Sequence, residues 1–400
     1  MNKIDAPFGH IYLCVRAHLR MRDGLRGRGW GGGWGSGWSP CKPRDCLRQA
    51  NGAPDGDGTA GRRDELGHFA AAKFSGVRVN EFSLFMGPAL WKRQVGETLY
   101  AIRLVPVGGY CAMEGEDGDS DDPRSFDRVA WWKRFIILVA GAAMNFICGV
   151  LLMLVFFLPV QQVVVPVIDS FEEFSTVDGE FGLQVGDEIL EVDGEKLYTQ
   201  ADFSMLLTLN PADSHDLVVL RNGERVFLDD LLMEKHEVAY EDGTRAMLYG
   251  MNFTVRNLGF FGKLNYAWRQ TMDTVRMVRL SLQMLLTGQA GLKDMSGPVG
   301  IVQEMSNVAQ ASATWLDALL NMVYFGGFIA INLAVMNLLP IPALDGGRVV
   351  GLLITTAVEA VTHKKINPKY EGYLHGAGMI LLLGLMGIIM FKDIIVLFRG

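Results

Sequence analysis

The sequence predicts an α-helical polytopic membrane protein with an embedded small β-sheet and an inserted β-rich domain. Half of its 400 residues are hydrophobic, which is more than a soluble domain of this size needs to fill its core. Three apolar windows, residues 135–160, 323–346 and 374–398, are each long enough to cross a hydrocarbon layer that requires about 20 helical residues. Two other segments have the short apolar runs that are typical of β-strands.

The chain begins with a segment of unusual composition. Residues 1–63 are rich in Gly, Arg and Trp or in turn-forming polar residues, so they cannot bury a core and are expected to be disordered. Residues 64–76 predict a helix, because apolar residues recur at helical spacing until Gly76 ends the pattern. Residues 77–122 alternate in β fashion around the turn in WKRQVGE and end in an acidic loop, which predicts a small sheet.

Positively charged residues near the apolar windows predict how the chain crosses the membrane. Such clusters remain on the cytoplasmic side, so residues 159–320 are expected outside the cytoplasm. The net charge of -7 and the lack of a broader basic face argue against nucleic-acid binding. His363 and His375 flank the last basic loop and are expected to be polar residues at the membrane interface. The basic clusters are Arg124, Arg128, Lys133 and Arg134, and Arg348, Lys364, Lys365 and Lys369.

Residues 163–255 combine short β-rich runs with turn signals and predict a separate domain. The stretch GLQVGDEILEVDG, which starts at Gly182, resembles the strand and turn signature of PDZ domains. A PDZ domain binds an extended peptide as an added strand at a sheet edge. Residues 260–320 follow with the pattern of amphipathic helices and a GPVGI loop. The resemblance implies a peptide-binding role for Gly182, Leu183, Gly186 and Asp187.

Three residues at the start of the first predicted helix can meet at one metal ion. At about 100° per residue, Asp64, Glu65 and His68 fall in one sector of the helix. Zinc proteases with the motif HExxH hold Zn2+ with two ligands one turn apart, and the intervening Glu is the general base. Here Asp64 stands where the first histidine of that motif is expected.

A further candidate ligand lies in NLLPIPALDGG, residues 337–347. Pro340, Pro342 and Asp345 interrupt an apolar span, and such residues are tolerated at membrane depth only where protein or water encloses them. A carboxylate oxygen can serve as the third protein ligand of zinc and leave one position for water. Asp345 is therefore a candidate metal ligand.

With these motifs the chain resembles the site-2 protease family, and within it the bacterial RIP zinc metalloproteases of the regulator of sigma-E protease (RseP) type. Residues 64–400 carry the family's motifs in order: ELGHF, ETLYAIRLVPVGGY, GAAMNF, one PDZ domain, GPVGI and NLLPIPALDGG. The resemblance implies that His68 and Asp345 hold Zn2+, with Asp64 in place of the family's histidine. It implies that Glu65 is the general base, and that the substrate is positioned by Asn145, Gly108, Gly109, Tyr110 and Asn337.

The same resemblance implies where the protein works and on what. It indicates a multi-pass protein of the bacterial cytoplasmic (inner) membrane, with the PDZ domain on the extracytoplasmic side. The implied activity is regulated intramembrane proteolysis, in which a transmembrane segment of a membrane-bound regulator is cut. The expected partners are the lipid bilayer and a single-span membrane protein substrate, such as an anti-sigma factor, or a signal-peptide remnant.

The residues before Glu65 depart from the family pattern. Family members begin with an apolar span that leads into HExxH, whereas this chain has GTAGRR followed by Asp64. Three explanations stay open: an active enzyme that uses Asp64 as a ligand, a catalytically impaired relative that acts as a PDZ peptide-binding membrane protein, or a mistranslated N-terminal segment of a normal protease. The abrupt start of the match at Glu65 favours the third.

Overall fold

The computed structural model describes most of the chain after the N-terminal segment. The described residues fall into two compact units. The first, here called the hairpin unit, holds those from Glu65 to Ala143 and from Leu338 to Met386. The second, called the β-domain unit, holds those from Met144 to Asn337 and from Gly387 to Arg399. The ranges described are 65–116, 120–179, 182–210, 212–239, 245–288, 298–312, 314–363 and 369–399, so segment 1–63 and Asp64 lie outside them.

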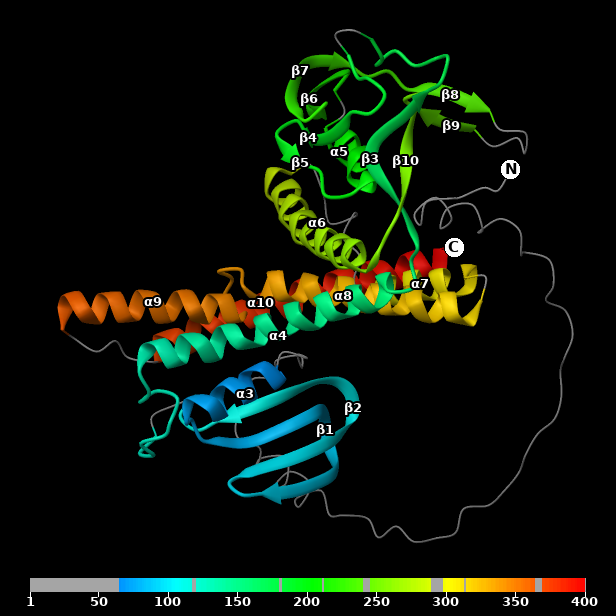
Figure 1. The fold of residues 1–400 in the computed structure, drawn as a ribbon. Helices are drawn as coiled ribbons and strands as arrows, with labels where there is room; N and C mark the ends of the chain where they lie inside the picture. The colour runs from blue at the N-terminus through cyan, green and yellow to red at the C-terminus, as the bar shows by residue number, and fades with distance from the viewer. Residues whose placement is uncertain are drawn as a thin grey trace, which may run out of the picture. The chain divides into compact units, whose positions relative to one another are not determined.

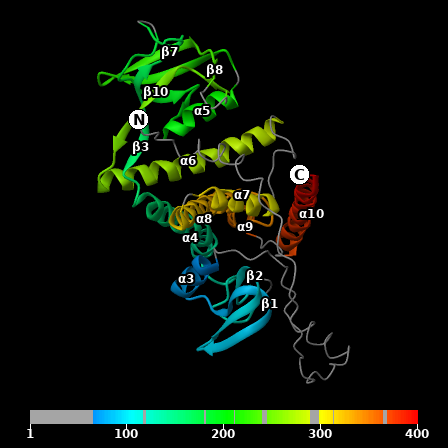
Figure 2. The same ribbon diagram turned by 90° about the vertical axis from the view of Figure 1, so that its right-hand side faces the viewer.

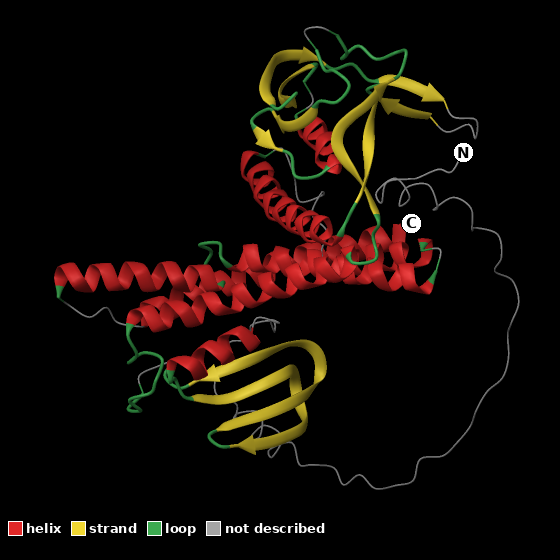
Figure 3. Cartoon of the chain, viewed as in Figure 1, coloured by secondary structure: helices red, strands yellow, loops and turns green. Residues whose placement is uncertain are grey.

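In the described part of the chain, a short helix and two long strands come first and a long helix follows (Figures 1 and 3). The remaining strands come next with one helix among them, and the rest of the chain is helical. The helices are α3 (Glu65–Ser75), α4 (Trp131–Phe157), α5 (Gln200–Leu209), α6 (Phe260–Thr287), α7 (Pro298–Ala311), α8 (Trp315–Asn337), α9 (Asp345–Thr362) and α10 (Lys369–Arg399). The strands are β1 (Val79–Val95), β2 (Thr98–Met113), β3 (Gln162–Phe171), β4 (Glu188–Val192), β5 (Glu195–Lys196), β6 (Ser214–Arg221), β7 (Glu224–Leu232), β8 (His236–Ala239), β9 (Arg245–Leu248) and β10 (Met251–Asn257).

Three helices are long and apolar enough to span a membrane, which confirms the predicted class of a polytopic membrane protein with an inserted β domain. They cover Trp131–Phe157, Trp315–Asn337 and Gly372–Ile395 in the described part of the chain. The second differs from the predicted window 323–346, because α8 ends at Asn337 and a turn precedes α9. Pro340 and Pro342 lack the backbone N–H groups that would continue the helix.

The strands β1 and β2 form an antiparallel sheet in which each strand is used twice. The first part of β1 pairs on one side with the end of β2 and on the other with its beginning, as Phe82 faces both Cys111 and Tyr100. A left-handed Phe85, with φ 69°, lies where β1 changes direction. The segment Gly109–Met113 pairs with β1 on one side only among the described strands, so it forms an edge of this sheet.

A small apolar core fastens α3 to this sheet. It includes Ala72 and Val77, which are fully or almost fully buried, together with Ile137 from α4. Phe69 of α3 adds an aromatic contact to Phe82, with ring centroids 4.8 Å apart. The helix that carries Glu65 and His68 is thereby fixed against both the sheet and the first part of α4.

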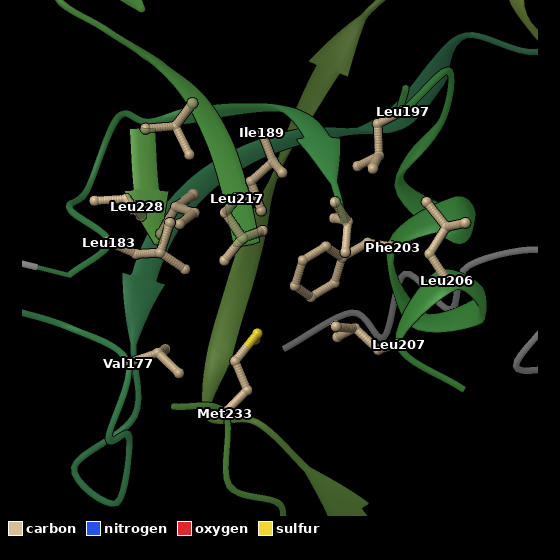
Figure 4. Packing of buried hydrophobic residues seen from close by; sticks show 13 residues of the cluster. Val177, Leu183, Ile189, Leu197, Phe203, Leu206, Leu207, Leu217, Leu228 and Met233 are labelled. Atoms are coloured by element: carbon tan, nitrogen blue, oxygen red, sulfur yellow. The ribbon is translucent and has the colours of Figure 1, made fainter. Parts of the chain in front are cut away.

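The β domain is an antiparallel sheet with the strand order β10-β3-β4-β6-β7, to which β5 adds by pairing with β4. Both ribbon views show α5 beside this sheet (Figures 1 and 2). The core gathers Leu183, Ile189, Phe203 and Leu217 from strands, turn and helix, each no more than 1% exposed (Figure 4). In β6, His215, Leu217 and Val219 are buried and the residues between them are not, so this strand turns every second residue inward.

A buried ion cluster connects α6 to the β domain. Arg276 of α6 pairs with Asp202, the capping-box residue of α5, at 3.0 Å and with Asp273 at 2.5 Å. Arg276 also donates a hydrogen bond to the carbonyl oxygen of Lys196. Burial, and then the nearby charge of Asp202, raise the pKa of Asp273 to about 8.

This cluster predicts a pH-dependent stability of the β domain. A carboxyl group whose pKa is raised on folding contributes stability that is fully present below its ordinary pKa of 3.8 and is lost as pH rises through about 8. We expect the urea midpoint of the β domain, measured in the full chain by pulse proteolysis, to fall between pH 5 and 8 more steeply than in Asp273→Asn. The exposed Asp229→Asn should retain the slope, and an unchanged slope in Asp273→Asn would contradict the assignment.

Candidate metal centre

His68 is held in one orientation by a backbone carbonyl. It lies in the first turns of α3 and is 8% exposed. Its Nδ1 is 2.8 Å from the carbonyl oxygen of Ile137, and because a carbonyl oxygen only accepts, Nδ1 carries the proton of the neutral ring. The lone pair of the neutral ring is then on Nε2, which is the arrangement that metal-binding histidines use.

Asp345, the first residue of α9, faces the lone pair of His68. Its Oδ2 lies 3.4 Å from His68 Nε2, and both side chains are about one-tenth exposed. This separation exceeds the 2.7–2.9 Å or so of a charge-assisted hydrogen bond. Two ligand atoms of one tetrahedral Zn2+ lie roughly 3.3–3.5 Å apart, as follows from Zn–N and Zn–O bonds of about 2.0–2.2 Å. The donor types and their spacing therefore fit two ligands of one zinc ion.

The helix α4 leaves room for His68 through a glycine. A Cβ atom added at Gly141 would lie 2.2 Å from His68 Nε2 and 2.7 Å from its Cε1. No real side chain tolerates such contacts, so any larger residue at this position would displace the imidazole. The GAAMNF motif thus has a steric role at the metal centre that the sequence alone did not reveal.

The turn before Asp345 lies very close to the backbone at the start of α9, and this approach requires a glycine at position 346. A Cβ atom at Gly346 would lie 2.3 Å from the carbonyl oxygen of Leu339. The adjoining Arg348 donates a hydrogen bond from Nη1 to Glu116 Oε1 at 2.5 Å. The first turn of α9, which carries Asp345, is therefore packed against the preceding turn and tied to the segment after β2.

Glu65 lies at the edge of the β1–β2 sheet. A Cβ atom at Gly109 would be 3.8 Å from Glu65 Cγ, an ordinary contact distance, and 2.6 Å from the carbonyl oxygen of Ser83, so this glycine lets the edge segment approach β1 closely beside Glu65. Glu65 and His68 share one side of α3, three residues apart. The predicted general base, one predicted ligand and the sheet edge are thus neighbours within the hairpin unit.

The other predicted substrate-positioning residues have different locations. Gly108 is part of β2, and Tyr110 is hydrogen-bonded to Arg103 at 2.5 Å, while burial raises the pKa of the phenol. Asn145 lies one turn after Gly141 on α4, is 3% exposed, and its side-chain nitrogen finds no hydrogen-bond partner among the described residues. Asn337 is the last residue of α8 and is 3% exposed. Their roles stay predictions.

Within the described ranges, no three His, Cys, Asp or Glu side chains lie close enough together to hold a metal ion. His68 and Asp345 supply two such groups. Asp64, the third candidate ligand, lies outside the described residues.

The predicted PDZ residues shape the loop between β3 and β4. Leu183 is fully buried in the domain core, and Gly186 has φ 93°, a backbone conformation that glycine adopts without strain. Asp187 is 1% exposed and accepts hydrogen bonds from Arg221 Nε and Nη2 at 2.9 and 2.8 Å. Arg221 Nη2 also donates to the carbonyl oxygen of Gly182 at 2.8 Å. A direct role of these residues in peptide binding stays a prediction.

The pair of Asp187 and Arg221 is expected to stabilise the β domain strongly. Arg221→Met would leave a buried carboxylate without its cation, a change that costs about 3–5 kcal/mol. The measurement is the urea midpoint of the β domain in the full chain. Arg225→Met, at an exposed position of β7, is the matched control, and equal midpoints for the two variants would refute the expected cost.

A buried histidine and a carboxylate at ligand spacing, with a glutamate on the same helix as the histidine, are residue types that metalloproteases use. A sequence model of Peptidase family M50 matches residues 64–385, and the chain belongs to this family of zinc metalloproteases. The match confirms the family that the motifs indicated.

Relatives of known name support the same assignment. A protein of Clostridium perfringens, named as a candidate zinc metalloprotease, is 33% identical over 336 residues, which cover 83% of this chain and 94% of the relative. A similarly named protein of Clostridium acetobutylicum is 32% identical over 334 residues, covering 83% and 93%. The zinc metalloprotease RasP of Oceanobacillus iheyensis is 27% identical over 423 aligned positions, covering 82% and 95%.

Proposed function

We propose that this protein is an intramembrane zinc metalloprotease that cleaves transmembrane segments of membrane-bound regulators. The observation that carries the proposal is the 3.4 Å separation of His68 Nε2 and Asp345 Oδ2, with Glu65 on the same helix as His68. The family membership and the apolar helices that could span a membrane support it. The names of the relatives indicate zinc as the metal.

His68 and Asp345 would hold the ion, and Asp64 is the candidate for the third protein ligand. Bound zinc lowers the pKa of a coordinated water and polarises the carbonyl group of the substrate. Glu65 removes a proton from the water and later delivers it to the nitrogen of the leaving peptide. Ile137 keeps the proton of His68 on Nδ1 throughout, because its carbonyl oxygen accepts the hydrogen bond there.

The edge segment Gly109–Met113 is the proposed docking strand for the substrate. A transmembrane helix hides its scissile carbonyl in its own hydrogen bonds, so a few residues must unwind and find new backbone partners. A sheet edge offers such partners by strand addition, and this segment pairs with β1 on one side only among the described strands. Gly109 in this segment lies next to Glu65, the proposed general base.

The proposed setting is the bacterial cytoplasmic membrane, with the PDZ domain on the extracytoplasmic side. The basic residues just before and within the first turn of α4, such as Arg128 and Lys133, favour the cytoplasmic side for the start of that helix. The β domain follows the other end of α4 and would then lie outside, where it can filter substrates by size. The proposed substrate is a single-span membrane protein, such as an anti-sigma factor, or a signal-peptide remnant.

One observation favours a second function. Asp64 stands in the place of a histidine ligand, and its shorter side chain must reach the same ion. A chain that fails to hold zinc would be a catalytically impaired relative that binds peptides through its PDZ domain. The two functions differ in whether the full chain carries metal and cleaves a peptide bond.

The test compares the wild-type chain with Asp64→His, both purified in detergent. Zinc content is measured by atomic absorption, and cleavage is measured on a single-span model substrate. We expect Asp64→His to contain about one zinc per chain and to cleave the substrate, with the wild-type protein binding zinc more weakly. Absence of zinc and of cleavage in both proteins would refute the protease proposal and leave the peptide-binding function.

A further inference from the structure

The turn that presents Asp345 contains two backbone hydrogen bonds of its own, from Ile341 N–H to Leu339 O at 2.7 Å and from Leu344 N–H to Ile341 O at 3.1 Å, and neither involves Ala343. The turn links α8 to α9, and Pro340 and Pro342 provide no backbone N–H group. Ala343 adopts φ 80°, a left-handed conformation that is unfavourable for a residue with a side chain. A turn of this kind keeps one geometry only when its surroundings impose it.

The helix α10 supplies such surroundings. Nδ1 of His375 accepts a hydrogen bond from the backbone N–H of Ala343 at 3.0 Å. One turn further along α10, a Cβ atom at Gly378 would lie 2.6 Å from Pro342 Cβ and 2.7 Å from its carbonyl oxygen. Residues three apart lie on one side of a helix, so His375 and Gly378 contact the Pro342–Ala343 backbone from the same side of α10.

We infer that His375 is a positioning residue for the metal centre, acting through the backbone of Ala343 on the carboxylate of Asp345. Only Leu344 separates Ala343 from Asp345, so a rotation of the Ala343 backbone would move the carboxylate directly. The fit to zinc depends on the 3.4 Å separation between that carboxylate and His68 Nε2, which a shift of about 1 Å would abolish. Gly378 assists by letting α10 approach the turn. The inference rests on the proposed function, because it assigns His375 to the same centre.

The variants distinguish a hydrogen-bond acceptor at position 375 from a side chain that only fills the space. His375→Leu fills the space but removes the acceptor. His375→Asn places its Oδ1 at the same number of bonds from Cβ as Nδ1 of histidine, so it can accept the same hydrogen bond. Tyr373→Leu, at a position of α10 that is 73% exposed, is the matched control.

Two measurements on the full chain report the hydrogen bond and its effect separately. Hydrogen–deuterium exchange of the peptide covering residues 339–347 reports protection of the Ala343 amide. Zinc affinity is measured by competition with a chromophoric chelator. We expect His375→Leu to increase exchange and weaken zinc binding by about 10- to 100-fold, as loss of a residue that supports a metal ligand does. His375→Asn should restore both to within a few fold, and Tyr373→Leu should change neither.

Zinc affinity in His375→Leu equal to that of the wild type would overturn the positioning role, and so would a His375→Asn variant that behaves like His375→Leu in both measurements. These outcomes leave the proposed protease function intact, since the unaltered chain still binds zinc. Absence of zinc from both the wild-type chain and Asp64→His overturns the inference and the proposed function together, and it is recognised without any change at position 375.

Discussion

Replacing Glu65 by Gln should reduce cleavage of a single-span substrate by about 10²- to 10⁴-fold, the usual contribution of a general base. Gln keeps the size of the side chain but cannot accept the proton from the attacking water. Zinc content should remain unchanged, because the two donor atoms at ligand spacing belong to His68 and Asp345. The measurement pairs a cleavage assay with metal analysis of the same full-length preparation.

The control for this variant is Glu304→Gln, at an exposed position of α7, which should cleave at the normal rate. The comparison is made in the wild-type chain and again with Asp64→His, so that weak metal binding does not conceal the effect. Cleavage that persists in Glu65→Gln at the normal rate would remove Glu65 from the mechanism. Loss of zinc together with cleavage would instead make Glu65 a ligand.

Gly141→Ala should strongly weaken zinc binding although it replaces none of the predicted ligands. The new Cβ would lie 2.2 Å from His68 Nε2, 2.7 Å from Cε1 and 2.8 Å from Cδ2, so the whole ring must leave its place. The hydrogen bond from Nδ1 to Ile137 would be lost as well. We expect zinc affinity to fall by at least about 100-fold, because a displaced ring removes a ligand as well as its orientation.

The matched control is Gly384→Ala on α10, where an added Cβ meets no atom within 4 Å. It should keep the zinc affinity and thermal stability of the wild type. Overpacking at Gly141 also predicts a loss of stability of about 1–3 kcal/mol, seen as a lower unfolding midpoint of the apo protein. Normal zinc binding in Gly141→Ala would show that His68 has room to move and still bind.

Much of the fold followed from local patterns in the sequence. Helical spacing after Asp64 indicated α3, and the short β-rich runs around the Asp-Gly turn at Asp193 indicated strands of the β domain. Such signals depend on residues that are close together in the sequence, so they can be recognised without knowing the tertiary structure. The three apolar windows likewise indicated membrane spans, although α8 ends at Asn337.

Features that depend on contacts far along the chain were not predictable in this way. α9 was missed, because it lies between a proline-containing window and the basic residues Lys364 and Lys365, which together suggested a loop. The first part of β1 pairs with two parts of β2, and Phe85 in the left-handed conformation follows directly after it. A left-handed phenylalanine was not expected from the sequence. His375 was expected to be an interfacial residue, whereas it accepts a hydrogen bond from Ala343, 32 positions earlier.

The candidate site likewise contains some residues that the sequence revealed and others that it did not. Glu65, His68 and Asp345 were found because their residue types and spacing match a known chemical motif. The roles of Gly141 and Ile137 were not found, since a glycine and a backbone carbonyl carry no chemical signature in a sequence. Only the approach of α4 to α3 gives these two residues their effect on the imidazole.

The two ends of the β domain meet at one place. β3 and β10 are paired, Gln162 is opposite Asn257, and their side chains are joined by a hydrogen bond of 2.9 Å. At the same place, α4 is connected to α6 through Lys263 Nζ, which donates to the carbonyl oxygen of Leu158 at 2.5 Å. The two ends of the domain therefore lie next to each other. A single genetic event could insert, duplicate or exchange the domain without separating the flanking helices. The sequence of the domain can therefore change between relatives without displacing the helices on either side of it.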